Sequence, residues 1–242
     1  MPRSLLSLVL ACTLVAACGG GNHGPTGPTP TAARISRTRF FAFGDSITAG
    51  EVTVPTGAAG GLGKLVVVPA ASYPSVLQSR LASTYAGQSA SITMTNQGAG
   101  NEQILDGVQR FNQVFPGSGA QVVLLQEGVN GLGFVGPDTS TGLMRIMVQQ
   151  AKSAGARVYV GSMIPTVPGR PRSGNPAALV TYNDVLQIMS SQEAITYVDL
   201  YNPMLADAQA LIGSDGLHPT EAGYRRIADL FFDAIKRELE ER

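Results

Sequence analysis

A serine near the start of the chain and a histidine near its end are the residues best suited to do chemistry together. The 242 residues include two histidines, and His23 lies in a stretch rich in Gly, Pro and Thr. Ser46 directly follows an apolar run at residues 40–43. A serine hydroxyl is a poor nucleophile until a base removes its proton, and imidazole suits that role near neutral pH. The sequence therefore predicts that His218 activates Ser46 for attack on a carbonyl carbon.

An acidic residue stands close enough to orient this histidine. Asp215 lies three residues before His218. In a tight turn its carboxylate reaches the second ring nitrogen, where it fixes the tautomer and stabilises the imidazolium. Asp45 is expected to steady the turn that presents Ser46. Two structural alternatives stay open: Ser46 caps a following helix, or Asp215 caps a helix while His218 is exposed.

Short apolar runs alternate with helical patterns along the chain, and these elements must position the reactive residues. The predicted strands are residues 40–43, 91–96, 122–125, 157–162 and 195–200. The predicted helices are residues 73–85, 103–115, 141–154, 177–190, 203–211 and 220–240. Strands interleaved with helices predict an α/β fold, a three-layer α/β/α sandwich with a mostly parallel five-stranded sheet.

Ligands in such folds bind beyond the carboxyl ends of the strands. Ser46, Gly98 and Asn130 each follow a predicted strand, so we expect them at one edge of the sheet. Two long segments, residues 51–72 and 167–175, also follow strands and are expected to overhang this site.

The composition excludes several other classes of function. Lys plus Arg and Asp plus Glu both number 17, so no basic stripe suggests nucleic acid. Apolar residues make up 44% of the chain, which suits a compact domain. The sequence contains neither a Cys/His cluster typical of zinc sites nor a phosphate-binding Gly-x-x-x-x-Gly-Lys loop, and no cofactor is expected.

The N-terminus predicts export. Arg3 precedes a short apolar run at residues 5–17, a pattern typical of a signal peptide. The segment Val15-Ala16-Ala17-Cys18 resembles a bacterial lipoprotein signal, in which the cysteine becomes lipidated. We thus expect a signal at residues 1–17, a Gly/Pro/Thr tether at 18–37 and a domain at 38–242, held at the cell envelope by a lipid on Cys18 alone. An ordinary cleaved signal, with no role for Cys18, is the alternative.

Four sequence blocks in order resemble the SGNH/GDSL hydrolase superfamily of esterases, lipases, thioesterases and carbohydrate deacetylases. The blocks read FGDSIT at residues 43–48, NQGAG at 96–100, EGVN at 127–130 and DGLHP at 215–219. The resemblance spans roughly residues 39–240 and implies a flavodoxin-like sandwich. It also implies that Ser46, Asp215 and His218 form the catalytic set.

The resemblance further implies an oxyanion hole. Its donors would be the backbone N–H of Ser46, that of Gly98 or Gly100, and the side chain of Asn130. Asn101 stands where a second glycine is often found in the family. Gly131 replaces a usual aspartate, which puts the positioning of Asn130 in question, and Gln126 and Glu127 are possible substitutes.

Remaining polar residues are interpreted more simply. Asp199 is expected to cap a helix, and Arg170 and Arg172 to be solvated loop charges rather than anion ligands. The leading hypothesis is a serine esterase acting on a small-molecule or glycan ester. The alternatives are an O-deacetylase for polysaccharide or peptidoglycan, and a catalytically silent binding lipoprotein.

Overall fold

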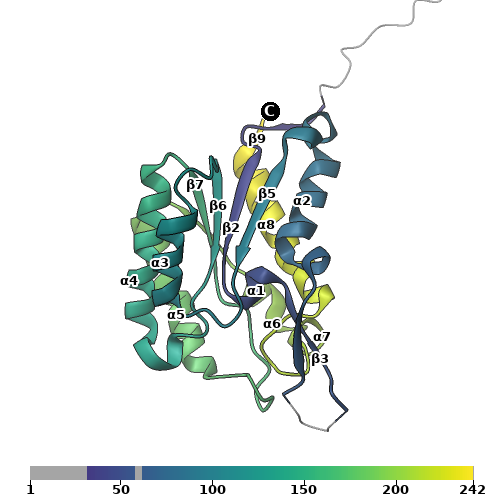
Figure 1. Cartoon of the computed structure of the whole chain (residues 1–242), viewed down its shortest axis with the longest axis vertical. Coiled ribbons are helices and arrows are strands. Elements are labelled where there is room, and N and C mark those ends of the chain that lie inside the picture. Colours follow the sequence, from purple (N-terminus) through teal and green to yellow (C-terminus); the bar gives the residue numbers. More distant parts are fainter. Residues whose placement is uncertain (1–31, 58–61, 242) are drawn as a thin grey trace, which may run out of the picture. The chain divides into compact units, whose positions relative to one another are not determined.

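The computed structural model describes residues 32–57 and 62–241, and its centre is a parallel sheet (Figure 1). The strands are β2 (Arg39–Gly44), β5 (Thr93–Gly98), β6 (Val122–Gln126), β7 (Arg157–Gly161) and β8 (Thr196–Val198). Their order across the sheet is β5-β2-β6-β7-β8, and every neighbouring pair is parallel. The predicted five-stranded α/β fold is confirmed.

Alternation of side chains along the strands divides the core into two layers. Phe40 and Ala42 of β2 join one buried cluster, whereas Phe41 and Phe43 join the other. Successive residues of a strand point to opposite faces, and both faces here are covered, so the strand is apolar throughout. This explains why an uninterrupted apolar run precedes Ser46.

Helices cover the two faces of the sheet (Figure 1). On one face lie α2 (Tyr73–Thr84) and α8 (Glu221–Leu239), and on the other lie α3 (Ile104–Val114), α4 (Leu132–Ser153) and α5 (Pro176–Gln192). The helix after β2 and the helix after β6 are thus on opposite faces, although these strands are neighbours. Such a switch in direction opens a crevice at the carboxyl ends of the strands, where ligands bind in sheets of this kind.

Two predicted helices differ most from the structure. Helix α4 begins at Leu132, nine residues earlier than expected, but it is broken at Gly136, which has φ 73° and ψ 169°. Glycine and the following Pro137 explain why the early turns gave no clear helical signal. The single helix expected at residues 203–211 is instead two short helices, α6 (Asn202–Leu205) and α7 (Ala208–Leu211).

Small elements complete the fold. Helix α1 (Ser46–Ala49) follows β2, and a hairpin of β3 (Glu51–Val54) and β4 (Lys64–Val67) occupies the segment expected to overhang the site. Two 3₁₀ turns, η1 (Pro69–Ala71) and η2 (Ala86–Ser91), flank α2.

The chain enters the domain earlier than residue 38. β1 (Arg34–Ile35) pairs antiparallel with β9 (Glu240–Glu241), and Ile35 is buried in the core. Packing therefore extends back at least to Arg34, into the segment that the sequence assigned to a tether.

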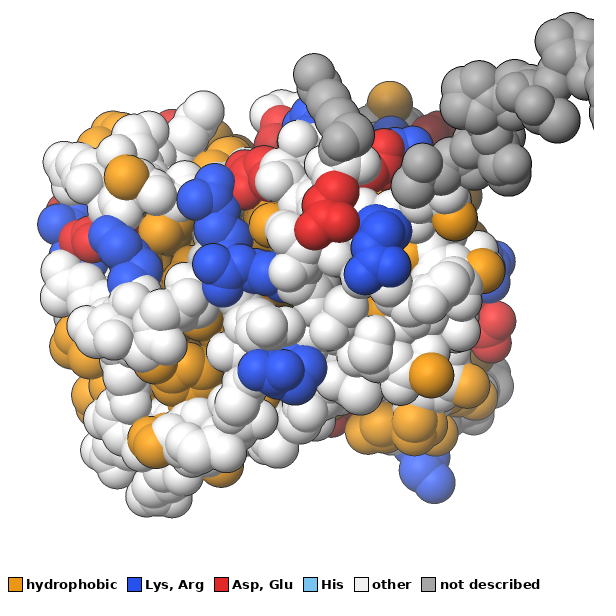
Figure 2. Space-filling model, turned by 90° about the horizontal axis from the view of Figure 1, so that it is seen from above, with side chains coloured by type: hydrophobic (Ala, Val, Ile, Leu, Met, Phe, Trp, Pro, Cys, Tyr) orange, Lys and Arg blue, Asp and Glu red, His pale blue; other side chains and the backbone are white. Residues whose placement is uncertain are grey.

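The end of the molecule that carries the C-terminus shows basic and acidic side chains interspersed (Figure 2). Ion pairs join Arg34 to Glu241 and Arg157 to Glu238 there. Among the described residues, no helix has both the length and the apolar character needed to cross a bilayer.

Candidate active site

A tight turn at the end of β2 presents Ser46. Asp45 precedes α1 and its Oδ1 accepts a hydrogen bond from the backbone N–H of Ile47 at 3.0 Å. Gly44 must be glycine, because a Cβ there would lie 1.9 Å from the carbonyl oxygen of Gln126. The predicted role of Asp45 in steadying this turn is therefore confirmed, and Ser46 stands at the first position of the helix.

The structure brings together the three residues that the sequence paired. The Oγ of Ser46 lies 2.9 Å from Nε2 of His218, and Nδ1 of His218 lies 2.6 Å from Oδ2 of Asp215. Asp215 and His218 are buried. These distances suit transfer of a proton from the serine to the imidazole. The alternative in which His218 is an exposed residue is excluded.

Asp215 is held as a carboxylate. Burial alone would raise its pKa, but hydrogen bonds from His218 and from the Leu217 N–H lower the pKa to about 2. Its Oδ1 accepts from the backbone N–H groups of Leu217 and His218 at 3.0 and 3.1 Å, which leaves Oδ2 for the imidazole. An ionised carboxylate at this position is able to stabilise a protonated imidazole.

The segment at residues 167–175 braces the loop that carries Asp215. The N–H of Arg172 donates to the Asp215 carbonyl at 2.7 Å, and Nε of Arg172 lies 3.6 Å from Oδ2 of Asp215. The guanidinium of Arg170 donates to the carbonyls of Ile212 and Gly213. The expectation that both arginines are solvated loop charges is therefore wrong, since each one holds the histidine loop.

The segment that contains the second sequence block brings Asn101 to the cavity wall. The N–H of Gly98 donates to Oδ1 of Asn96 at 2.9 Å, and a Cβ on Gly98 would lie 2.0 Å from the nitrogen of Ala49. Gly98 thus serves close packing of β5 against α1, and neither it nor Gly100 lines the cavity beside Ser46. Asn101 does line the cavity, with the left-handed φ of 59° that asparagine tolerates better than most residues.

Asn130 reaches the site without the aspartate that Gly131 replaces. It lines the cavity, and its Nδ2 donates to the carbonyl of Glu102 at 2.8 Å. An amide nitrogen carries two hydrogens, so the second stays available to a ligand. The side chains of Gln126 and Glu127, the two proposed substitutes, are buried: the Gln126 amide contacts the sulfur of Met163, and the Glu127 carboxylate makes no hydrogen bond to the described residues. A backbone carbonyl therefore orients Asn130.

A buried acidic cluster lies behind the serine turn. Glu102 pairs with Arg110, and both carboxylate oxygens of Glu127 have no hydrogen-bond partner among the described residues. Burial, followed by the charges of Asp45 and Glu102, raises the pKa of Glu127 well above its usual range. Burial also raises the pKa of Asp45 to about 6. Burial without a hydrogen-bond donor thus favours the neutral form of the Glu127 carboxyl group.

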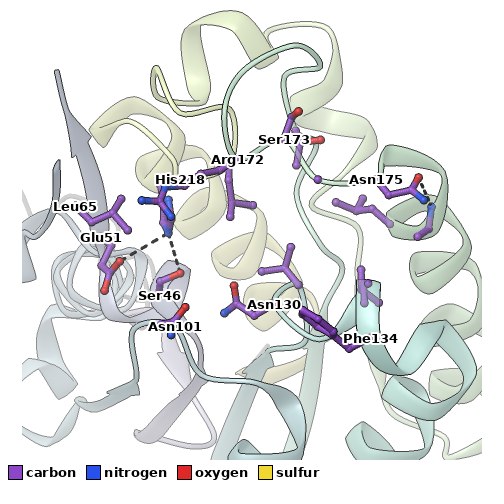
Figure 3. A pocket seen from close by; sticks show the side chains of 18 residues that line it. Ser46, Glu51, Leu65, Asn101, Asn130, Phe134, Arg172, Ser173, Asn175 and His218 are labelled. Atoms are coloured by element: carbon purple, nitrogen blue, oxygen red, sulfur yellow. Dashed lines mark hydrogen bonds and ion pairs between the residues drawn. The ribbon is translucent and has the colours of Figure 1, made fainter. Parts of the chain in front are cut away.

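A cavity of about 320 Å³ opens above Ser46 and His218 (Figure 3). Its apolar wall consists of Val129, Leu132, Phe134 and Leu179. The polar side, with Glu51 and Asn101, lies across the cavity from Phe134 (Figure 3), and Arg172 also lines the cavity. Leu65 of the β3–β4 hairpin also lines it, which confirms that this segment helps to shape the site.

Asp199 lies away from this cavity, at the end of β8. Its Oδ1 accepts from the backbone N–H groups of Tyr201 and Asn202, at the start of α6. Asp199 thus satisfies the first N–H of α6, as predicted, although the N-cap position itself belongs to Tyr201.

A sandwich that brings a serine, a histidine and an aspartate into contact at the carboxyl ends of its strands fits a hydrolase. Residues 42–226 match the model of the GDSL-like Lipase/Acylhydrolase family, and the chain belongs to this family. It is also similar to a GDSL lipase of Mycobacterium tuberculosis, with 30% identity over 84 residues. That match covers 34% of this chain and 36% of the lipase.

Several solved structures share this fold. A lipase/acylhydrolase from Enterococcus faecalis is similar at a TM-score of 0.68 and 20% identity, covering 85% of this chain and 98% of that one. An acetyl xylan esterase is similar at a TM-score of 0.61 and 19% identity, covering 81% of this chain and 98% of that one. At these identities the likeness concerns the fold.

Proposed function

We propose that this hydrolase is a serine esterase that cleaves carboxylic esters through an acyl-Ser46 intermediate. The observation that carries the proposal is the 2.9 Å contact between Oγ of Ser46 and Nε2 of His218. In the first step the imidazole takes the hydroxyl proton while Oγ bonds to the ester carbon. The imidazolium, stabilised by Asp215, then gives that proton to the departing alcohol. Water releases the acid in the same way.

The tetrahedral intermediate needs donors for its negative oxygen. We assign these to the backbone N–H of Ser46, the free hydrogen of the Asn130 amide, and the backbone N–H of Asn101. All three residues line the cavity. Each such donor typically contributes about 3 kcal/mol to lowering the barrier.

The apolar wall supports binding of the acyl group. Leu132 and Phe134 begin α4, and Leu179 belongs to α5, so two helices form this side. A volume of about 320 Å³ is at the small end of ligand sites, which favours short acyl groups.

The test compares the purified full chain with Ser46→Ala and His218→Ala in hydrolysis of p-nitrophenyl acetate and butyrate. Ser153→Ala, on the exposed end of α4, is the matched control. We expect both site variants to lose activity while remaining folded. A fluorophosphonate probe should label the wild type and leave Ser46→Ala unlabelled. Equal turnover by the wild type and both site variants would refute the mechanism. A folded but unlabelled wild type would favour a silent binding protein.

A second candidate is an O-deacetylase for a polysaccharide or peptidoglycan. The small cavity and its polar side favour it, as does the likeness to an acetyl xylan esterase. Acetyl release from acetylated xylan, compared with hydrolysis of medium-chain p-nitrophenyl esters, separates the two.

We also propose that the enzyme is anchored at the cell envelope by a lipid on Cys18. The support is the sequence around Cys18, and these residues lie outside the part that the structure describes. Incorporation of labelled palmitate should be lost in Cys18→Ser and kept in Cys12→Ser. Labelling of Cys18→Ser would contradict the proposal.

A further inference from the structure

Glu51 lines the cavity but has no part in the mechanism above. It is the first residue of β3 and follows Gly50, whose φ of 91° ends α1. Its backbone carbonyl accepts a hydrogen bond of 2.6 Å from the buried hydroxyl of Tyr224. The backbone is thus fixed on both sides of this residue, and its side chain turns into the cavity with 13% of its surface exposed.

The carboxylate of Glu51 lies beside the reacting atoms (Figure 3). Its Oε2 is 3.8 Å from Nε2 of His218, the same nitrogen that lies 2.9 Å from Oγ of Ser46. Its Oε1 lies against Gly100, where a Cβ would approach it to 2.1 Å. Two carboxylates therefore flank the imidazole, with Asp215 at Nδ1 and Glu51 near Nε2.

Glu51 is not neutralised by another side chain in the described parts of the chain. Its one partner within 4 Å there that can carry a positive charge is His218, which does so only when protonated, and the nearby Arg172 lies against Asp215 instead. A partly buried carboxylate is stabilised by hydrogen-bond donors, and it has only acceptor atoms to offer. A ligand in the cavity can supply such a donor in place of water.

The chemistry places the alcohol half of the ester at this carboxylate. Nε2 must lie within hydrogen-bond reach of the departing oxygen in order to protonate it. Glu51 borders that same nitrogen on the polar side of the cavity, whereas the apolar wall from α4 and α5 lies on the other side. A hydroxyl on the carbon next to the esterified carbon can then donate to the carboxylate.

We propose that Glu51 selects esters whose alcohol carries such a neighbouring hydroxyl, as glycerol and sugars do, over esters of plain alkanols. This inference rests on the proposed esterase function. Hydrogen bonds to a charged acceptor that form with the reacting substrate raise kcat/KM, here by roughly tenfold for a partly solvated carboxylate.

The experiment measures acetate release from 2-hydroxyethyl acetate and 2-methoxyethyl acetate, which differ in the hydrogen that can be donated. The full-length wild type, Glu51→Gln, Glu51→Ala and the exposed control Glu221→Gln are compared. The readout is the ratio of kcat/KM for the two esters within each protein, so a general loss of activity cancels. We expect a ratio of roughly 10 for the wild type and the control. It should fall to roughly 2 or 3 for Glu51→Gln and to about 1 for Glu51→Ala.

A wild-type ratio near 1, or a ratio unchanged in either Glu51 variant, would overturn the proposal. The unchanged ratio is also what a purely electrostatic effect on the imidazolium predicts, because that effect acts on both esters alike. Glu51→Gln keeps the shape of the side chain, so it answers the question even where Glu51→Ala does not fold. If p-nitrophenyl acetate is cleaved in a Ser46-dependent way while the ratio is flat, only the role of Glu51 fails. If the wild type cleaves none of the esters, both proposals fail.

Discussion

Replacement of Asp215 by asparagine tests the geometry around His218 most directly. In Asp215→Asn, the side-chain oxygen can keep both bonds from the Leu217 and His218 N–H groups, which now hold Oδ1. The amide nitrogen then replaces Oδ2, 2.6 Å from Nδ1 of His218. Because an amide nitrogen donates, Nδ1 must accept, and the ring proton moves to Nε2. A protonated Nε2 cannot take the proton of Ser46, so the general base is lost.

The size of the effect follows from the same contacts. Loss of the correct tautomer costs roughly 1,000- to 10,000-fold in kcat in sites of this kind. The pKa of Asp215 is about 2 instead of 3.8. One pKa unit corresponds to about 1.4 kcal/mol, so ionisation of Asp215 stabilises the fold by about 2 kcal/mol. The lowered pKa means that this contribution is present above pH 3.8 and disappears as the pH falls toward 2.

Two measurements check this reasoning. Hydrolysis of p-nitrophenyl acetate gives kcat, and urea unfolding at pH 7 gives the free energy of unfolding, with Asp138→Asn as the exposed control. We expect Asp215→Asn to lose activity by the factor above while losing no more than about 2 kcal/mol of stability. A variant that keeps more than a tenth of wild-type kcat would refute the role of Asp215. A variant that fails to fold would show that the loop, rather than the tautomer, depends on the charge.

Further predictions concern neighbours of the triad. Asn130→Ala should lower kcat roughly 100-fold with little change in KM, because a transition-state donor is lost, and steady-state kinetics on p-nitrophenyl acetate checks this. Asn101→Gly should keep activity within about threefold, since the N–H remains and glycine accepts the left-handed φ, whereas Asn101→Val should cost about 1–2 kcal/mol in urea unfolding; equal behaviour would contradict this. In the wild type, the raised pKa of Glu127 means that this group ionises in the unfolded chain at a lower pH than in the folded protein, so the free energy of unfolding falls as the pH rises above about 4.5. Glu127→Gln should remove this decline, and urea unfolding at pH 5 and pH 8 measures the difference. Phe134→Ala should lower kcat/KM for octanoate roughly three- to tenfold more than for acetate, and an equal loss on both would place the acyl chain elsewhere.

Elements buried on both faces were predictable from the sequence, and elements at the site were less so. An apolar run precedes Ser46, and Leu77 and Leu81 are spaced as on one face of a helix. Both patterns indicate burial, and these residues lie in the core. Helix α1 has four residues, too few to show a period, and the hairpin that begins at Glu51 is half-exposed and rich in glycine. Such segments take their conformation from what they pack against.

The second block shows what a motif alone does not reveal. Gly98 admits the backbone of Ala49, a contact between segments about fifty residues apart that no local signal indicates, and the oxyanion role expected for Gly98 or Gly100 stays a prediction. The left-handed backbone at Asn101 was predictable from the sequence. Asn101 stands where a second glycine is common in the family, and asparagine often replaces glycine at left-handed positions. The position of Glu51 beside His218 had no signal, because it depends on how the chain turns back after α1.

Carboxylates around the serine turn take different protonation states because their donors differ. Asp215 is as buried as Glu127, but it receives hydrogen bonds from an imidazole and two backbone N–H groups and remains ionised. Glu127 receives none from the described residues and faces Glu102 and Asp45, so its neutral form is favoured. Two carboxyl groups of the same chemistry can therefore differ in protonation state, and so in role, because their surroundings shift their pKa values in opposite directions. Negative charge is thereby kept at the imidazole, and the neutral form of Glu127 limits the negative charge that collects beside Asp45 and Glu102.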